Sequence, residues 1–249
     1  MFNYIFALVR FCLLLVVAAI SFVVVLFVPL LNYQQRAKIV KNWAIITLKT
    51  VGMHREYRTT KPSNYFAHNT MVIANHFSWL DVAVLYTLYY INFVGKTEMQ
   101  KWPFLNRLIR AGGTIFINRS NKRDILKVNQ NISEELIAGK CIGLFPEGSV
   151  NDGHKILPFK SSILEAAILA QSTIIPVVLI YRYKNGNIAY PMSYARQNFY
   201  QNVINSLKCN GFKTTIIELP AVNAGSFGCR RELSEYLYHL MSEEYKKHL

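Results

Sequence analysis

Apolar and polar positions alternate along most of this chain in blocks that predict strands and helices in turn. Short apolar runs rich in β-branched residues predict buried strands, and longer segments with apolar residues three or four apart predict helices. The predicted strands cover residues 71–74, 91–95, 114–118, 141–145, 173–180 and 214–219. The predicted helices begin near Ser78 and cover 101–110, 123–137, 163–171 and 232–249. This order predicts an α/β fold with a mostly parallel mixed sheet flanked by helices.

The N-terminal segment breaks this alternation, because no charged residue interrupts it from Phe11 to Leu31. A helix of that length can cross a hydrocarbon core of roughly 30 Å. The residues after Leu31 do not form the small-residue cleavage site of a signal peptide, so we predict a retained membrane-anchoring helical segment. Arg10 precedes this segment, and several cations follow it closely. The asymmetry places the rest of the chain on the cytoplasmic face of the membrane.

Residues 36–52 mix apolar and cationic positions at helical spacing, and two interpretations fit the pattern equally. In the first, an amphipathic helix lies in the membrane interface with Trp43 at headgroup level, and the segment before it dips into the bilayer and returns. In the second, the helix packs on a soluble domain. A polar stretch with a proline follows at 59–63. We therefore predict an N-terminal anchor and interfacial helix over 1–58 and a second domain over 59–249.

Composition adds a preference for partners that carry negative charge. Lys and Arg total 28 against 14 acids, a formal net charge of +14, and apolar residues make up 52% of the chain. The charge favours nucleic acid, an anionic bilayer or phosphorylated substrates, and the apolar fraction favours membrane contact. Zinc-ligand spacing, RNP-like segments and helix-turn-helix patterns are missing from the sequence, so we expect no nucleic-acid partner. The four scattered cysteines predict neither a metal site nor a disulfide framework.

The stretch from Asn75 to Asp81 joins the predicted strand 71–74 to the next helix. His76 lies in the loop and Asp81 in the first helical turn, so the imidazole can fold back to meet the carboxylate. A carboxylate on one ring nitrogen fixes the tautomer and leaves the other nitrogen to act as a general base. A structural interpretation also fits, because Ser78 and Asp81 form the pattern of a helix capping box.

Three more segments carry unusual residues at the ends of predicted strands. Arg119 and Glu147 each stand at or just after such an end, and Pro176 lies unusually early in the predicted strand 173–180. In mostly parallel sheets the ligand crevice lies at the carboxyl ends of the strands. The sequence therefore predicts that these residues gather around His76.

These loops resemble the four sequence blocks of the 1-acyl-sn-glycerol-3-phosphate acyltransferase family, which is part of the glycerolipid acyltransferase group. The N-H-x-x-x-x-D, G-x-I-F-I-D-R, F-P-E-G and fourth blocks correspond, in order, to Asn75-His76 with Asp81, Gly113–Arg119, Phe145–Gly148 and Ile175-Pro176. Order and spacing agree over about residues 60–185, and four blocks in order are far more specific than any one of them. The resemblance implies a glycerolipid acyltransferase-like fold.

The resemblance also implies an activity. Members of this family are membrane-bound enzymes that move a fatty acyl group from acyl-CoA or acyl-carrier protein to the free hydroxyl of a lysolipid. The first candidate acceptor is 1-acyl-glycerol-3-phosphate (lysophosphatidic acid), which would become phosphatidic acid. The expected partners are therefore membrane lipids, the lysolipid and the acyl donor. The donor is a co-substrate, and we expect no cofactor and no metal.

Roles for single residues follow from the same resemblance. His76 is the expected general base, held by Asp81, and no Ser or Cys nucleophile is required. Backbone N–H groups near Ser78 are expected to stabilise the oxyanion. The expected substrate-binding residues are Asn75, Lys96, Arg119, Glu147, Gly148 and Ser149.

The chain departs from the family pattern in three places. Asn118 replaces the usual acid before Arg119, and Ser149-Val150-Asn151 stands where members often have Thr-Arg-Ser. Ser161-Ser162 stands where many members have a second basic residue and a glycine. Two candidates for phosphate binding are thus missing, which leaves open another acceptor, as in the related lyso-ornithine lipid acyltransferases. An alternative of a different class is a non-catalytic basic protein that binds membranes or nucleic acid, and it predicts no thioester turnover.

Overall fold

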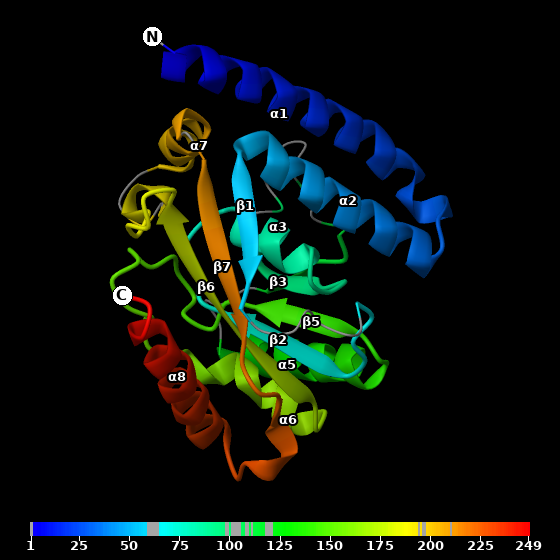
Figure 1. Cartoon of the computed structure of the whole chain (residues 1–249). Helices are drawn as coiled ribbons and strands as arrows, with labels where there is room; N and C mark the ends of the chain where they lie inside the picture. The colour runs from blue at the N-terminus through cyan, green and yellow to red at the C-terminus, as the bar shows by residue number, and fades with distance from the viewer. Residues whose placement is uncertain are drawn as a thin grey trace.

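The computed structural model describes residues 2–58, 65–97, 100, 106–107, 110, 112–117, 122–193, 195, 198–209 and 211–249. Its helices are α1 (Phe2–Phe27), α2 (Tyr33–Val51), α3 (Asp81–Tyr86), α5 (Lys122–Ile137), α6 (Glu165–Leu169), α7 (Phe199–Lys208) and α8 (Arg230–Lys246). Its strands are β1 (Met53–Tyr57), β2 (Thr70–Ala74), β3 (Asn92–Lys96), β4 (Ile115–Ile117), β5 (Cys141–Leu144), β6 (Thr173–Tyr183), β7 (Phe212–Glu218) and β8 (Val222–Asn223). Figure 1 shows the strands at the centre of the molecule and the helices around them.

The strands form one sheet in the order β1-β7-β6-β2-β5-β3-β4, and β8 pairs with β6. The strands from β6 to β4 in this order run parallel to one another, whereas β7 and β1 run in the opposite direction. The predicted mostly parallel mixed sheet flanked by helices is therefore confirmed. The carboxyl ends of β2, β3, β4 and β5 lie along one edge of the sheet, where such sheets bind their ligands.

Helices cover both faces of the sheet, and the side chains of β2 alternate between the two apolar layers. Val72 and Ala74 lie in the layer formed with α2, α3 and α7. Met71 and Ile73 lie in the layer formed with α5, α6 and α8. Every residue of β2 is buried, which explains why its sequence is apolar throughout. In Figure 1, α2 and α3 lie away from α6 and α8.

Pro176 lies inside β6, as the predicted strand 173–180 requires, and not at the carboxyl end of that strand. Pro176 pairs with Ile73 of β2, and its carbonyl accepts a hydrogen bond from Leu219 N at 2.9 Å. On that side of β6, β7 has just ended and β8 has not yet begun. The missing N–H of the proline therefore faces a gap in the ladder, where it leaves no strand bond unmade.

Most predicted elements are present, but their boundaries differ. α3 begins at Asp81 rather than near Ser78, and the predicted helix 163–171 is a short 3-10 turn followed by α6. β1 and α7 were not predicted. β1 lies before the expected domain boundary at residue 59 and still forms an edge of the sheet. Most of the predicted helix 101–110 lies outside the described residues.

α2 packs on the sheet through one face, as the second interpretation of residues 36–52 predicts. The buried residues of α2 are Ala37, Ala44, Thr47, Leu48 and Val51. The ring of Trp43 meets the ring of Tyr86 edge-on at 6.3 Å. α1 runs antiparallel to α2 (Figure 1). Most of the large apolar side chains of α1 are exposed. Among the described residues, one helix is long and apolar enough to cross a membrane, over Tyr4–Leu30 with mean hydropathy 3.3.

Candidate active site

The loop between β2 and α3 brings His76 and Asp81 together. Nδ1 of His76 lies 2.8 Å from Oδ2 of Asp81. The same oxygen accepts hydrogen bonds from the backbone N–H groups of Phe77 (2.7 Å) and Ser78 (2.9 Å). The hydroxyl of Tyr181, from β6, donates to the other oxygen, Oδ1. A carboxylate surrounded by donors places the imidazole proton on Nδ1, so Nε2 is the basic nitrogen.

Asp81 makes both contacts that the sequence left open, one with His76 and one with the start of the helix. Its carboxylate reaches the N–H of Ser78, which is one half of a capping box. The other half is missing, because the N–H of Asp81 donates to the backbone carbonyl of Ser78 at 3.1 Å and not to its hydroxyl. The N–H groups of Phe77 and Ser78 both donate to Asp81, so the expectation that N–H groups near Ser78 stabilise the oxyanion is wrong for these two.

The imidazole of His76 is held flat against an aromatic ring. It stacks on Phe145 with centroids 4.1 Å apart and an interplanar angle of 13°. Phe145 stacks in turn on Phe93, with centroids 5.9 Å apart. The side chain of His76 is 17% exposed, whereas Asp81 is fully buried. The ring is therefore fixed in orientation by Asp81 and Phe145, and part of it reaches the surface.

Glu147, in the loop after β5, holds the backbone of the loop that carries His76. Its buried carboxylate accepts hydrogen bonds from the N–H groups of His76 and Leu157, both at 2.7 Å. The side-chain amide of Asn151 donates to both carboxylate oxygens, at 2.9 and 3.0 Å. Asn151 also donates its own N–H to the carbonyl of His76 at 2.8 Å. Glu147 thus holds the backbone N–H of His76, and Asn151 holds its backbone carbonyl.

Burial shifts the ionisation of Glu147. Removal from water raises the pKa of its carboxyl group to about 7, although the hydrogen bonds from His76, Leu157 and Asn151 act in the opposite direction. Burial also raises the pKa of the Tyr181 hydroxyl well above its usual value, and the neighbouring Asp81 adds to the effect. Tyr181 therefore remains a hydrogen-bond donor to Asp81 at any ordinary pH.

The other predicted site residues lie in different environments. Asn75 is buried, and its amide exchanges two hydrogen bonds with the backbone of Leu179, at 3.0 and 2.8 Å. Gly148 adopts φ 72°, and a Cβ there would lie 2.8 Å from the Lys160 ammonium. Ser149 is exposed. Asn75 thus links the loop after β2 to β6, Gly148 allows the chain to turn, and Ser149 faces solvent.

The structure describes only the backbone of Lys96 and does not describe Arg119. Lys96 ends β3, at the same edge of the sheet as His76, but its side chain is not described. Arg119 lies outside the described residues. Their roles as substrate-binding residues remain predictions.

Two residues of the site were not selected from the sequence. Tyr181 follows the apolar run of β6, and no pattern in that run indicated a hydrogen bond to Asp81. Asn151 appeared only as a departure from the family pattern, and its position after F-P-E-G was the one available signal. Both belong to loops or strands far from His76 in the sequence, so their contacts depend on the order of strands in the sheet.

A small cavity of about 190 Å³ opens beside the loop that follows β5. Phe145, Pro146 and Gly148 form one wall, and apolar side chains of α5 form another. Lys160 also lines it. The volume is below the roughly 300–1,000 Å³ of ordinary ligand pockets, so a whole lysolipid would not fit inside. Within the described part of the chain, no group of three His, Cys, Asp or Glu side chains could hold a metal ion.

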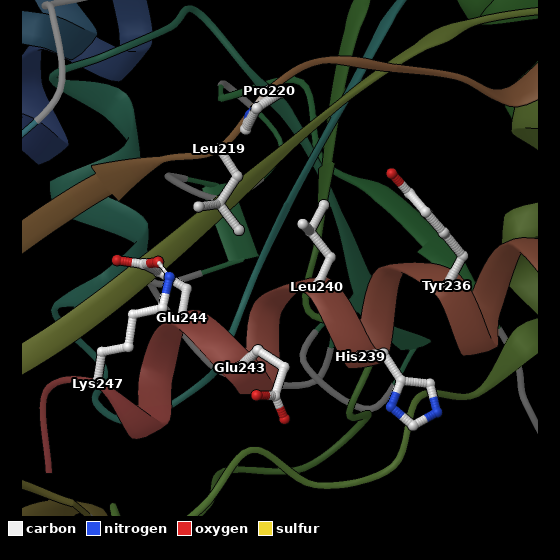
Figure 2. Close-up of a pocket in the computed structure, with 8 residues that line it drawn as sticks. All are labelled: Leu219, Pro220, Tyr236, His239, Leu240, Glu243, Glu244 and Lys247. Atoms are coloured by element: carbon white, nitrogen blue, oxygen red, sulfur yellow. Dashed lines mark hydrogen bonds and ion pairs between the residues drawn. The ribbon is translucent and has the colours of Figure 1, made fainter.

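A second groove of about 450 Å³ lies between the end of β7 and α8 (Figure 2). Leu219 and Leu240 point toward each other across it, and Glu244 pairs with Lys247 at 2.8 Å. It shares no residue with the loops around His76. It is larger than the cavity beside Phe145, but neither His76 nor Asp81 lines it.

Comparison with known proteins connects this geometry to a family. The Acyltransferase family model matches residues 51–180. A 1-acyl-sn-glycerol-3-phosphate acyltransferase from Neisseria gonorrhoeae is 35% identical over 135 residues, 54% of this chain and 53% of that protein. A lyso-ornithine lipid O-acyltransferase from Rhodobacter capsulatus is 40% identical over 100 residues, 40% of this chain and 36% of that protein. The chain thus aligns with about half the length, or less, of these curated relatives.

A solved structure shows the same fold. The crystal structure of the 1-acyl-sn-glycerophosphate (LPA) acyltransferase PlsC from Thermotoga maritima superposes with a TM-score of 0.75. The alignment covers 98% of this chain and 95% of that chain at 20% identity. The likeness therefore extends beyond the matched blocks to the N-terminal helices and the last helix.

Proposed function

This chain belongs to the acyltransferase family, and from that premise we propose that it is a membrane-bound lysolipid O-acyltransferase. The observation that carries the proposal is the 2.8 Å contact between His76 Nδ1 and Asp81, with the ring partly exposed at the carboxyl edge of the sheet. A positioned imidazole of this kind typically accelerates proton transfer by about 10²–10⁴-fold. Phe145 and Glu147, which belong to another block that resembles the family, contact the same ring and the backbone N–H of His76.

In the proposed reaction Nε2 of His76 removes the proton from the free hydroxyl of the lysolipid. The hydroxyl oxygen attacks the carbonyl carbon of the acyl thioester, and a C–O bond forms as the carbonyl electrons move to oxygen. When the carbonyl reforms, the C–S bond breaks and the thiolate takes the proton from the imidazolium. Asp81 stabilises that imidazolium, and Phe145 keeps the ring in its plane. The products are the acylated lipid and the free thiol.

The first candidate acceptor is lysophosphatidic acid, and the donor is acyl-CoA or acyl-carrier protein. Two relatives above 30% identity differ in the acceptor that their names give, a glycerol phosphate in one and an ornithine lipid in the other. Val150 favours the second possibility, because it stands where the family often has an arginine that could hold a phosphate. We therefore keep a lyso-ornithine lipid or another lysophospholipid as the second candidate.

The membrane holds the enzyme through α1 in this proposal, with the catalytic side on the cytoplasmic face. Apolar side chains cover the outward surface of α1, and lipid is the solvent that suits them. The net charge of +14 favours an anionic bilayer surface. A nucleic-acid partner is not part of the proposal.

The test uses purified protein, long-chain acyl-CoA or acyl-carrier protein, and a panel of lysolipids, with release of the free thiol as the measurement. We expect turnover with at least one lysolipid and its loss, by 100-fold or more, in His76→Ala. Membrane association and the melting temperature of the variant should stay near those of the wild type. Absence of thiol release with every lysolipid would favour the non-catalytic alternative, and near-normal release in His76→Ala would reject the base assignment.

A further inference from the structure

α7 exposes an apolar and aromatic stripe that the proposed chemistry does not use. Tyr200 is 77% exposed, Ile204 46% and Phe199 37%. Tyr200, Ile204 and Lys208 stand four residues apart, so they lie along one side of the helix. The opposite side of α7 is buried. No acidic residue occurs within α7, so the stripe carries only the positive charge of Lys208.

One end of this stripe continues into the exposed surface of α1. The ammonium of Lys208 lies 4.9 Å from the ring centroid of Tyr4. The guanidinium of Arg10 donates hydrogen bonds to the carbonyls of Leu207 (3.1 Å) and Cys209, at the end of α7. Those carbonyls are among the ones that a helix leaves without partners. Figure 1 shows the N-terminal part of α1 passing close to α7. The contacts of Lys208 and Arg10 therefore join the exposed side of α7 to that of α1 in one continuous surface.

The other end of the stripe reaches the catalytic loop. The ring of Phe199 meets the indole of Trp79 edge-on, with centroids 6.1 Å apart. Trp79 stands three residues after His76 in the loop that Asp81 holds. α7 therefore connects the apolar anchor helix to the loop that carries the general base.

We propose that α7 is a second membrane-contacting element, whose Phe199, Tyr200 and Ile204 side chains enter the headgroup and acyl-chain boundary of the bilayer that holds α1. Lipid is the occupant that the surface favours, because the stripe continues the long apolar surface of α1. Tyrosine and lysine at its ends are residues typical of membrane interfaces. The bilayer surface then lies beside Trp79, and the lysolipid reaches His76 from that side. The inference rests on the proposed function for this last step only.

The first test measures depth in the bilayer without any activity. Tyr200→Trp is bound to anionic vesicles whose lipids carry bromine on the acyl chains, and the quenching of wild type, with its three native tryptophans, is subtracted. We expect added quenching in this variant. Tyr236→Trp on α8, at a tyrosine that is 48% exposed, is the matched control and should show none. An unquenched Tyr200→Trp signal in protein that sediments with the vesicles means that the stripe meets water or another protein, and it would overturn the inference.

The second test separates membrane contact from chemistry. In Ile204→Glu, turnover of a long-chain lysolipid embedded in vesicles should fall about tenfold or more, because an apolar side chain in the boundary is replaced by a charge. Turnover of a short-chain, water-soluble lysolipid should stay the same, which also reports folding. Tyr236→Glu should leave both rates unchanged. Unchanged turnover of the vesicle-embedded lysolipid in Ile204→Glu would contradict the inference. If the wild type acylates neither acceptor, the proposed function is contradicted, but the quenching result stays valid.

Discussion

At the scale of single residues, the site depends on how many donors share one buried carboxylate. Asp81 accepts hydrogen bonds from His76, Phe77, Ser78 and Tyr181. Because Asp81 is fully buried, neither carboxylate oxygen can bond to water when a donor is lost. A neutral amide in its place could not accept all these bonds, because its nitrogen is a donor. The catalytic and the structural interpretations of Asp81 therefore make different predictions for the same substitution.

Asp81→Asn should lower kcat by about 100-fold or more, because the amide can no longer fix the Nδ1-protonated tautomer or stabilise the imidazolium. Tyr181→Phe removes one donor to the same carboxylate and leaves the imidazole contact in place. It should therefore cost far less in kcat, of the order of tenfold or below. Thiol release at saturating acceptor gives both values. Loss of melting temperature in Asp81→Asn without loss of kcat would favour the capping-box interpretation alone.

Asn151 should act as a positioning residue for His76. Asn151→Ala removes two bonds to Glu147 and leaves a buried carboxylate with fewer donors, at a cost of about 1–3 kcal/mol in the free energy of unfolding. The loosened loop should lower kcat more than it raises KM. Asn202→Ala is the control, since Asn202 is also buried but donates to the carbonyls of Met192 and Ser193. If the two variants lose similar stability and similar kcat, the loss of activity in Asn151→Ala comes from general destabilisation and not from a change in the position of His76.

Glu147 should make stability depend on pH in an unusual direction. Its pKa is about 7 in the folded protein, where burial raises it above the 4.5 expected of an exposed glutamate. The folded state therefore binds the proton more tightly, so this group stabilises the fold at low pH and that contribution is lost as pH rises from about 4.5 through 7. The melting temperature of wild type relative to Glu147→Gln should thus fall between pH 5 and pH 8. If the melting temperatures of the two proteins changed with pH in the same way across this range, the pKa shift would be contradicted.

At the scale of elements, the sequence predicted those whose residues repeat one pattern. β2 and β6 are apolar because they are buried on both faces, and α5 carries its apolar residues on one side. β1 was missed because its sequence, Met-His-Arg-Glu-Tyr, has polar residues that an edge strand tolerates. The early proline in β6 is explained by where the neighbouring strands β7 and β8 stop, which a sequence does not reveal.

The same contrast applies to the candidate site. The pairing of His76 with Asp81 was predictable because both lie in one short segment around a helix start. The partners that come from other strands, Tyr181 and the Glu147–Asn151 pair, depend on β6 and β5 lying on either side of β2. Strand order is a property of the whole sheet, so local patterns could not supply those contacts.

Arg10 should be needed for α1 to dock on α7. The side chain donates to carbonyls at the end of α7 and lies against Gly52, where an added Cβ would come within 2.4 Å of its guanidinium. Arg10→Leu keeps an apolar helix but removes these bonds, so protease cleavage between α1 and α2 in detergent should become faster. Lys38→Leu, which changes an exposed cation on α2, should not have this effect. Equal cleavage rates in both variants would show that Arg10 does not hold α1 in place.

At the scale of the whole molecule, the contacts of α1 bear on how the protein sits in the membrane. A helix that crosses the bilayer must leave the soluble domain soon after the headgroups. α1 instead touches the rest of the chain near both ends, through Tyr4 beside Lys208 and through Phe22, whose ring lies 5.9 Å from the Arg107 guanidinium. The arrangement favours a helix that lies in one leaflet and returns through α2.

This arrangement predicts that both ends of the chain lie on the same side of the membrane. An epitope tag at the N-terminus and another at the C-terminus should be removed together by protease added to inside-out vesicles, and both should be protected in right-side-out vesicles. A spanning α1 would instead expose one tag in each preparation, because the cations after Leu31 would stay inside while Met1 crossed. The comparison does not depend on catalysis, so it tests the membrane geometry even if the acceptor is still unidentified. Opposite protection of the two tags would reject the in-plane helix, and with it the continuous surface of α1 and α7.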